Sequence, residues 1–171
     1  MNIFFFSILT ISFFYFVPGA NGQDQSLLPS PKSPPMLEVR GAISKTNVKD
    51  GAHFDMEMLK VLPVAELETS TAVTDGVRRF EGFLMRDLLA YVGAQGTTVT
   101  AKALNDYTIK IAIAEFDRFD VLVAYEMDGE PLLPSDKGPL WLVYPRDQHV
   151  ELQDIRFDYR WVWQLRWLDI R

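Results

Sequence analysis

The chain has 171 residues, a formal net charge of −6 and 48% hydrophobic residues, which is enough apolar material for one domain with a buried core. An acidic balance without a basic stripe argues against nucleic acid, whose binding depends on lysine and arginine contacts to phosphates. The absence of cysteine excludes disulfides and thiolate catalysis, so packing must supply the stability.

The N-terminus predicts export. An apolar run extends from Ile3 to Val17, and about 15 residues is short for a membrane span of about 20. Small residues follow it, so we expect a secretory signal over residues 1–22, cleaved near Gly22–Gln23, and a periplasmic or secreted mature protein. No lysine or arginine precedes the run, which leaves an uncleaved anchor as the alternative. That segment would then be the chain's contact with the membrane.

The next segment, residues 23–36, is rich in serine, proline and glutamine, which is typical of a flexible tether. We find no internal repeat and no second linker. A single domain is therefore expected over residues 37–171.

The first half of this domain alternates between strand and helix signals. We expect a strand over 36–44, a short helix over 54–63 stopped by Pro63, and a strand over 64–71. A turn of the Asp-Gly type follows the strand. The spacing of leucines over 83–93, with Gly93 at its end, predicts a second helix.

The second half is mainly β. We expect alternating strands over 97–103 and 107–113, a hairpin arm over 120–132 that turns at Asp128-Gly129, and a buried strand over 138–145. The carboxylates between the strands and the hairpin, in "AEFDRFD", fit a solvated helical turn. The sum is an α+β domain, with a mostly β mixed sheet or barrel-like core and two or three short helices.

The C-terminal segment carries the clearest pattern. From Ile155 to Trp167 the odd positions are apolar or aromatic and most even positions are charged or polar, which predicts one or two strands with one packed face. We interpret the aromatic residues as core. The alternative is a sugar-stacking platform, which requires Trp161, Trp163 or Trp167 to be exposed.

No pattern specifies a catalytic centre or a metal site. His53 and His149 are the only histidines and have no neighbouring partners at ligand spacing, so we expect two ordinary loop residues. No glycine-rich nucleotide loop and no nucleophile elbow occurs. We therefore predict neither catalytic residues nor metal ligands.

Several motifs, taken in order, resemble a known family. "FDMEMLKVLP" is followed by "FEGFLMRDLLAYVGAQG", then "VTAKALNDYTIKIAI", "DVLVAYEMDGEPL" and "KGPLWLVYP". This order resembles the molybdopterin-binding domain of the sulfite oxidase superfamily over residues 40–145. The tail "RWVWQLRWLDI" is similar to the closing strand of short exported members.

The resemblance also locates the expected site. In catalytic members a cysteine ligates molybdenum at the position that falls within residues 68–71 here, where glutamate, threonine and serine stand. These are poor replacements for a soft thiolate. The resemblance therefore implies a vestigial pocket, with the following expected binding residues: Thr69, Thr71, Arg79, Asn105 and Tyr107.

Three functions follow from these observations. The first is an exported, non-catalytic relative that binds a small polar or anionic ligand, or a periplasmic or membrane protein, and holds no cofactor. The second is a genuine oxidoreductase that keeps molybdopterin without thiolate ligation. The third is a β-rich carbohydrate-binding or adhesion module. An Asx-type turn at Asn105 and simple packing of Tyr107 are the structural alternative for two of the proposed binding residues.

Overall fold

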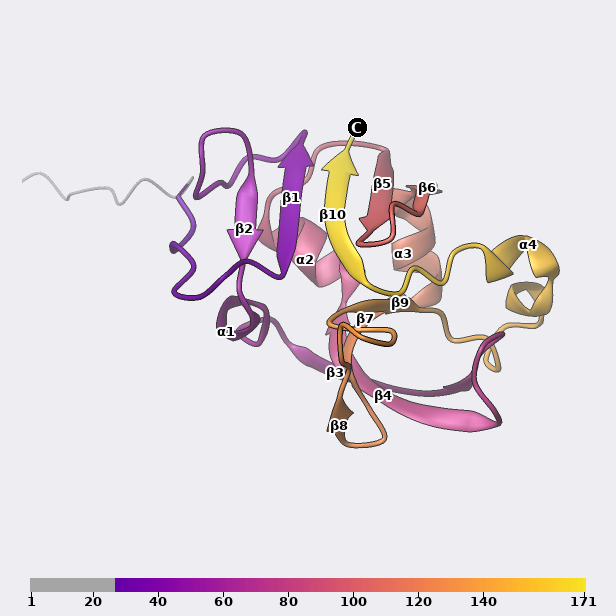
Figure 1. Ribbon diagram of the computed structural model, residues 1–171. Coiled ribbons are helices and arrows are strands. Elements are labelled where there is room, and N and C mark those ends of the chain that lie inside the picture. The colour runs from indigo at the N-terminus through magenta and orange to yellow at the C-terminus, as the bar shows by residue number, and fades with distance from the viewer. Residues whose placement is uncertain (1–26) are drawn as a thin grey trace, which may run out of the picture.

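The computed structural model describes residues 27–171 (Figure 1). The expected signal segment and the first residues of the expected tether lie outside this range. The described chain forms two sheets and several short helices, and the sheets are open rather than joined into a barrel. The α+β class is confirmed, while the closed form of a barrel-like core is not found.

The first sheet has five strands and contains both the first strand and the last. In spatial order they are β2 (Ala52–Phe54), β1 (Leu37–Gly41), β10 (Leu165–Ile170), β5 (Thr98–Ala103) and β6 (Thr108–Ala112). Only β1 and β10 pair in parallel. Parallel neighbours cannot be joined by a tight turn, and here the rest of the domain separates them.

The second sheet is antiparallel and carries the expected hairpins. Its strands are β3 (Val64–Ser70), β4 (Val77–Leu84), β7 (Leu122–Met127) and β8 (Glu130–Pro131), and β9 (Trp141–Val143) pairs with the first half of β7 on the edge opposite β4. Buried apolar side chains from both sheets form one continuous core.

The described residues contain four α-helices, one more than the sequence prediction allows. They are α1 (Met56–Leu59), α2 (Met85–Tyr91), α3 (Ile113–Phe119) and α4 (Ile155–Asp158), and a 3₁₀ helix (Val150–Gln153) precedes α4. Helices α2 and α3 lie behind the first sheet in Figure 1. Gly93 follows α2 with φ +61°, the left-handed conformation that ends a helix as predicted.

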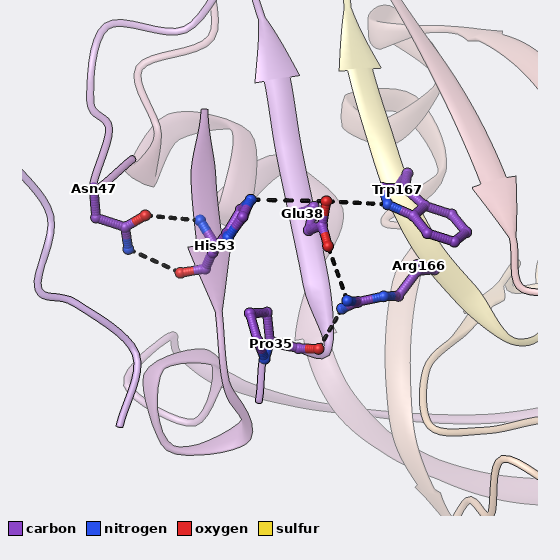
Figure 2. Close-up of polar contacts among 6 residues, drawn as sticks. All are labelled: Pro35, Glu38, Asn47, His53, Arg166 and Trp167. Carbon is purple, nitrogen blue, oxygen red and sulfur yellow. Dashed lines mark hydrogen bonds and ion pairs between the residues drawn. The ribbon is translucent and has the colours of Figure 1, made fainter. Parts of the chain in front are cut away.

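One polar network joins β1, β2 and β10 on the outer face of the first sheet (Figure 2). The Glu38 carboxylate accepts hydrogen bonds from Arg166 at 2.8 Å and from the indole of Trp167 at 3.1 Å. His53 lies 3.7 Å away on the other side. Because Glu38 stands opposite Trp167 in the parallel pair, this network fixes the register between β1 and β10.

The described part of the expected tether contacts the domain. Residues 27–36 precede β1, and Leu28 within them is buried in the core. The backbone N–H groups of Lys32 and Ser33 donate to the Asp55 carboxylate at 2.7 and 3.1 Å. The packed chain therefore begins before the expected domain boundary.

The strand prediction for the C-terminal segment is wrong in its first half. Asp154 accepts a hydrogen bond from the Arg156 backbone N–H and begins helix α4, and Ile155 is 68% exposed. Gln164 then adopts a left-handed φ of 52°, and the ladder slips between Leu165 and Trp167. After this bulge Leu168 and Ile170 are the buried residues of β10, so the packed face passes from odd to even positions, while Arg166 lies half-buried beside Glu38.

Candidate functional site

A small pocket opens where the β5–β6 turn meets the segment after α4. Its volume is about 170 Å³, and its walls are mostly aromatic. The lining residues are Asn105, Tyr107, Asp158, Tyr159, Trp161 and Trp163. Two of the predicted binding residues thus share a pocket with the aromatic tail.

The β5–β6 turn holds one wall in place. The side-chain oxygen of Asn105 accepts a hydrogen bond from the Tyr107 backbone N–H at 3.1 Å, and Asp106 adopts φ 66° between them. Asn105 therefore makes the Asx-type turn that was expected as the structural alternative to a binding role.

Tyr107 ties this turn to the tail. Its hydroxyl donates to the backbone carbonyl of Tyr159 at 2.5 Å. Burial, and then the nearby Tyr159 phenol, raise the pKa of the Tyr107 phenol, so this hydroxyl keeps its proton at neutral pH and remains a donor. The contact spans the gap between two segments that meet only in the folded chain.

The floor of the pocket continues into an aromatic cluster. Trp161 is 4% exposed, and its ring lies 6.2 Å from the centroids of both Trp141 and Tyr144. Burial raises the pKa of the Tyr144 phenol. Core packing of Trp161 is therefore confirmed, whereas Trp163 and Trp167 are half-buried.

Several buried polar atoms in this region lack a hydrogen-bond partner among residues 27–171. They are the indole nitrogens of Trp141 and Trp161, the hydroxyl of Tyr144 and one carboxylate oxygen of Asp158. An unpaired buried polar group costs about 1–3 kcal/mol. Native structures contain few of them, and each calls for an explanation.

At the end of β3, by contrast, the polar groups of Thr69, Ser70 and Asp147 form hydrogen bonds with one another. The Ser70 hydroxyl and backbone N–H donate to the Asp147 carboxylate at 2.6 and 2.5 Å, and the Asp147 backbone N–H donates to the Thr69 hydroxyl oxygen at 3.2 Å. The Ser70 hydrogen bonds lower the pKa of Asp147 below its usual range. We call this arrangement of Thr69, Ser70 and Asp147 the Ser70–Asp147 clamp.

The neighbouring side chains complete the turn after β3. The Thr71 hydroxyl shares a hydrogen bond with the Thr74 hydroxyl at 2.8 Å and accepts one from the Val73 backbone N–H. Arg146 reaches the Ser70 hydroxyl oxygen at 3.4 Å, while its buried Nε has no hydrogen-bond partner among residues 27–171. Sequence reasoning named the stretch containing Ser70 but missed Asp147, because Asp147 lies in the turn after β9, 77 positions along the chain, and no local pattern links the two.

Arg79 lies in β4 opposite Glu68, and its side chain turns away from the clamp toward Glu66. It is exposed and donates to the Glu66 carboxylate across the β3–β4 pair at 2.7 Å. The hydrogen bond to Glu66 and its charge raise the pKa of Arg79. Neither Arg79 nor the two predicted threonines, Thr69 and Thr71, line the aromatic pocket.

The described part of the chain has no cluster of three His, Cys, Asp or Glu side chains that could hold a metal ion. His53 lies in β2 beside Glu38, and the His149 ring packs edge-on against Phe119 at 5.2 Å. Within residues 27–171, no helix has the length and apolar character needed to cross a bilayer.

The sequence matches the family described as oxidoreductase molybdopterin binding domain over residues 46–150. This match covers more than half of the chain, so the protein belongs to that family, and the resemblance found in its motifs is confirmed. No curated protein sequence matches the chain.

The fold is also similar to a solved structure, the sulfane dehydrogenase SoxCD from Paracoccus pantotrophus. The TM-score is 0.59 at 19% sequence identity, and the similarity covers 78% of this chain and 37% of that one. Identity this low supports the fold alone. The chain thus spans less than half the length of the SoxCD chain it matches.

Neither the Ser70–Asp147 clamp nor the aromatic pocket fits a molybdenum-bearing cofactor. The oxygen atoms of the Ser70–Asp147 clamp are hydrogen-bonded to one another, and hard oxygens suit magnesium or calcium better than a metal that takes a soft thiolate. The aromatic pocket, at about 170 Å³, is also smaller than the roughly 300–1,000 Å³ typical of pockets for drug-sized ligands.

Proposed function

We propose that this chain is an exported, non-catalytic member of the molybdopterin-binding-domain family that acts as a small-ligand binding module. The observation that carries this proposal is the Ser70–Asp147 clamp. It stands where the family resemblance implies the metal-bound thiolate, and its hydroxyl and carboxylate are engaged with each other at 2.6 Å.

The aromatic pocket is the proposed binding site. It combines apolar walls with the amide of Asn105, the hydroxyl of Tyr107 and the carboxylate of Asp158, a mixture typical of small-molecule sites. Its one charged side chain is a carboxylate, which disfavours the anionic ligand expected from sequence and favours a neutral or cationic one. A periplasmic or membrane protein remains the second kind of occupant in this proposal.

The test is the metal and pterin content of the protein. The full chain would be expressed with its own N-terminus in cells that make molybdenum cofactor and recovered by osmotic shock, with a cysteine-bearing family member as positive control. Molybdenum and tungsten would be measured by mass spectrometry, and pterin by fluorescence after oxidation. We expect neither metal nor pterin at stoichiometric levels, and recovery in the osmotic-shock fraction.

Two variants of Ser70 test the role of the Ser70–Asp147 clamp directly. Ser70→Cys places a thiol within residues 68–71, where the resemblance implies the metal ligand, and Ser70→Ala removes the hydroxyl without adding a ligand. Stoichiometric molybdenum and pterin in the unmodified protein would contradict the proposal, and retention of that content in Ser70→Ala would identify a cofactor site that needs no ligand from this position.

A further inference from the structure

The aromatic pocket has the composition of a cation-binding cage. Tyr107, Tyr159, Trp161 and Trp163 supply four rings from two separate segments. The faces of such rings are electron-rich and attract organic cations, with tryptophan the strongest. The hydrogen bond from Tyr107 to the Tyr159 carbonyl holds the two segments together, so the cage is formed before any ligand arrives.

The charge in this pocket is negative and uncompensated. Asp158 is the one ionisable acid or base lining it besides the phenols, and it makes no ion pair with any described residue. One of its oxygens is buried without a hydrogen-bond partner. A charge left unpaired in partly buried surroundings is costly, and a bound cation would remove that cost.

The nearby basic side chains are already engaged elsewhere. Arg160 pairs with Glu115 and packs over the Phe157 ring, and Lys102 pairs with Asp106 at 2.8 Å. Neither lines the pocket. No basic group of the described chain therefore neutralises Asp158, and the site is left for an external cation.

The lining decides which kind of cation fits. Calcium and magnesium require several oxygen ligands around the ion, whereas this pocket offers one carboxylate among aromatic rings. A compact organic ammonium group suits both the rings and the carboxylate, because its charge is spread over an apolar surface.

We infer that this pocket binds a small organic ammonium ion, such as the head group of an amino alcohol or a methylated amine, with the charge held between the aromatic rings and Asp158. This inference deepens the proposed function and rests on it, because it names the ligand class of the same site.

The test compares two molecules of the same shape. Choline and its neutral isostere 3,3-dimethylbutan-1-ol differ in one atom, nitrogen against carbon, and therefore in charge. Each would be titrated into the purified chain while tryptophan fluorescence and calorimetric heat are recorded. We expect saturable binding of choline and at least about tenfold weaker binding of the isostere.

Two variants place the binding in this pocket. Asp158→Asn keeps the shape and removes the charge, and we expect about tenfold weaker choline binding; Trp163→Phe keeps a ring but weakens the cage, with a loss of several-fold. Arg79→Ala, on the exposed face of the β3–β4 pair, serves as the control and should leave binding unchanged. Thermal melts of each variant separate loss of binding from loss of folding.

The outcomes distinguish this inference from the proposed function. Equal binding of choline and the isostere, fluorescence quenching by neutral sugars but not by choline, or no saturation by choline would each overturn the inference. Metal and pterin content measured on the same preparation tests the proposed function separately. A metal-free protein that ignores choline overturns the inference alone, and a pterin-loaded protein that binds choline overturns the proposed function alone.

Discussion

The end of β3 and the aromatic pocket differ in how their polar side chains are hydrogen-bonded. At the end of β3 the hydroxyl, carboxylate and backbone groups of Ser70 and Asp147 bond to one another. In and beneath the pocket, buried polar atoms of Asp158, Trp161 and Tyr144 have no partner within the described chain. Where the family resemblance implies the metal ligand, the hydroxyl and carboxylate groups thus pair with each other, although the Nε atoms of the neighbouring Arg78 and Arg146 have no partner among residues 27–171. The aromatic pocket, beside the tail, instead leaves a carboxylate oxygen unpaired.

The largest expected effect comes from breaking the aromatic cluster. Trp161→Ala removes a 4% exposed ring that contacts two other aromatic residues, and we expect a loss of about 3–5 kcal/mol in the free energy of unfolding. Trp163→Ala, at a half-buried position, should cost about 1–2 kcal/mol. Urea denaturation followed by circular dichroism measures both, and equal costs would contradict the proposed role of Trp161 in the core.

Breaking the Ser70–Asp147 clamp should lower the free energy of unfolding by a smaller amount. Asp147→Ala leaves the Ser70 hydroxyl and N–H without their acceptor, but these groups are exposed to water. We therefore expect a loss of about 1 kcal/mol, measured as a shift of the urea midpoint. Asp136→Ala, at an exposed aspartate in the loop before β9, provides a surface control.

The clamp also predicts a dependence on pH. Because the folded-state pKa of Asp147 is lowered, chiefly by hydrogen bonds from Ser70, its contribution is complete above the unfolded pKa of about 3.9 and disappears as the pH falls through the lower folded value. Asp147→Asn should flatten the acid limb of the stability curve below about pH 4. An unchanged acid limb would show that the carboxylate charge does not stabilise the clamp.

Tyr144→Phe should cost little, in contrast to Tyr125→Phe. The Tyr144 hydroxyl is buried without a partner, so its removal should change stability by about 0–1 kcal/mol in the favourable direction, whereas the Tyr125 hydroxyl donates to Glu81 at 3.2 Å and its loss should cost about 1 kcal/mol. Burial raises the pKa of the Tyr144 phenol in the folded state. The stability that depends on a neutral phenol is therefore fully present below the unfolded pKa of about 10 and is lost as the pH rises through the folded-state pKa. Above pH 10 the free energy of unfolding should therefore fall less in Tyr144→Phe than in the parent protein, as measured by fluorescence-detected denaturation.

The smallest effect is expected at Arg79. Its ion pair with Glu66 is exposed on both sides, and such pairs contribute little in water. Arg79→Ala should leave the thermal midpoint, the metal content and choline binding unchanged. A clear loss in any of these would place Arg79 back among the binding residues expected from sequence.

Local signals account for most of the elements that sequence reasoning predicted. The strand β3, the helix α2 ending at Gly93 and the turn at Asp128-Gly129 all follow from residues within one short window. The tail was harder, because its alternating aromatics satisfy a strand pattern while Asp154 begins a helix and Gln164 adopts a left-handed φ. Periodicity predicts a buried face only where the backbone stays regular.

For the candidate site, too, sequence predicts the local features and misses the long-range contacts. Asn105 and Tyr107 could be selected from sequence because a short turn and a family motif contain them. Their meeting with the aromatic tail depends on a hydrogen bond between residues 52 positions apart, and the clamp joins residues 77 positions apart.

Composition, local periodicity and the order of motifs are enough to predict the lack of a thiol ligand, the α+β class and the family. Which polar groups are paired and which are left over becomes visible in the folded chain alone. Pairing depends on contacts between segments far apart in the chain, and no short stretch of sequence encodes which side chain will reach Ser70 and which will leave Asp158 without a partner.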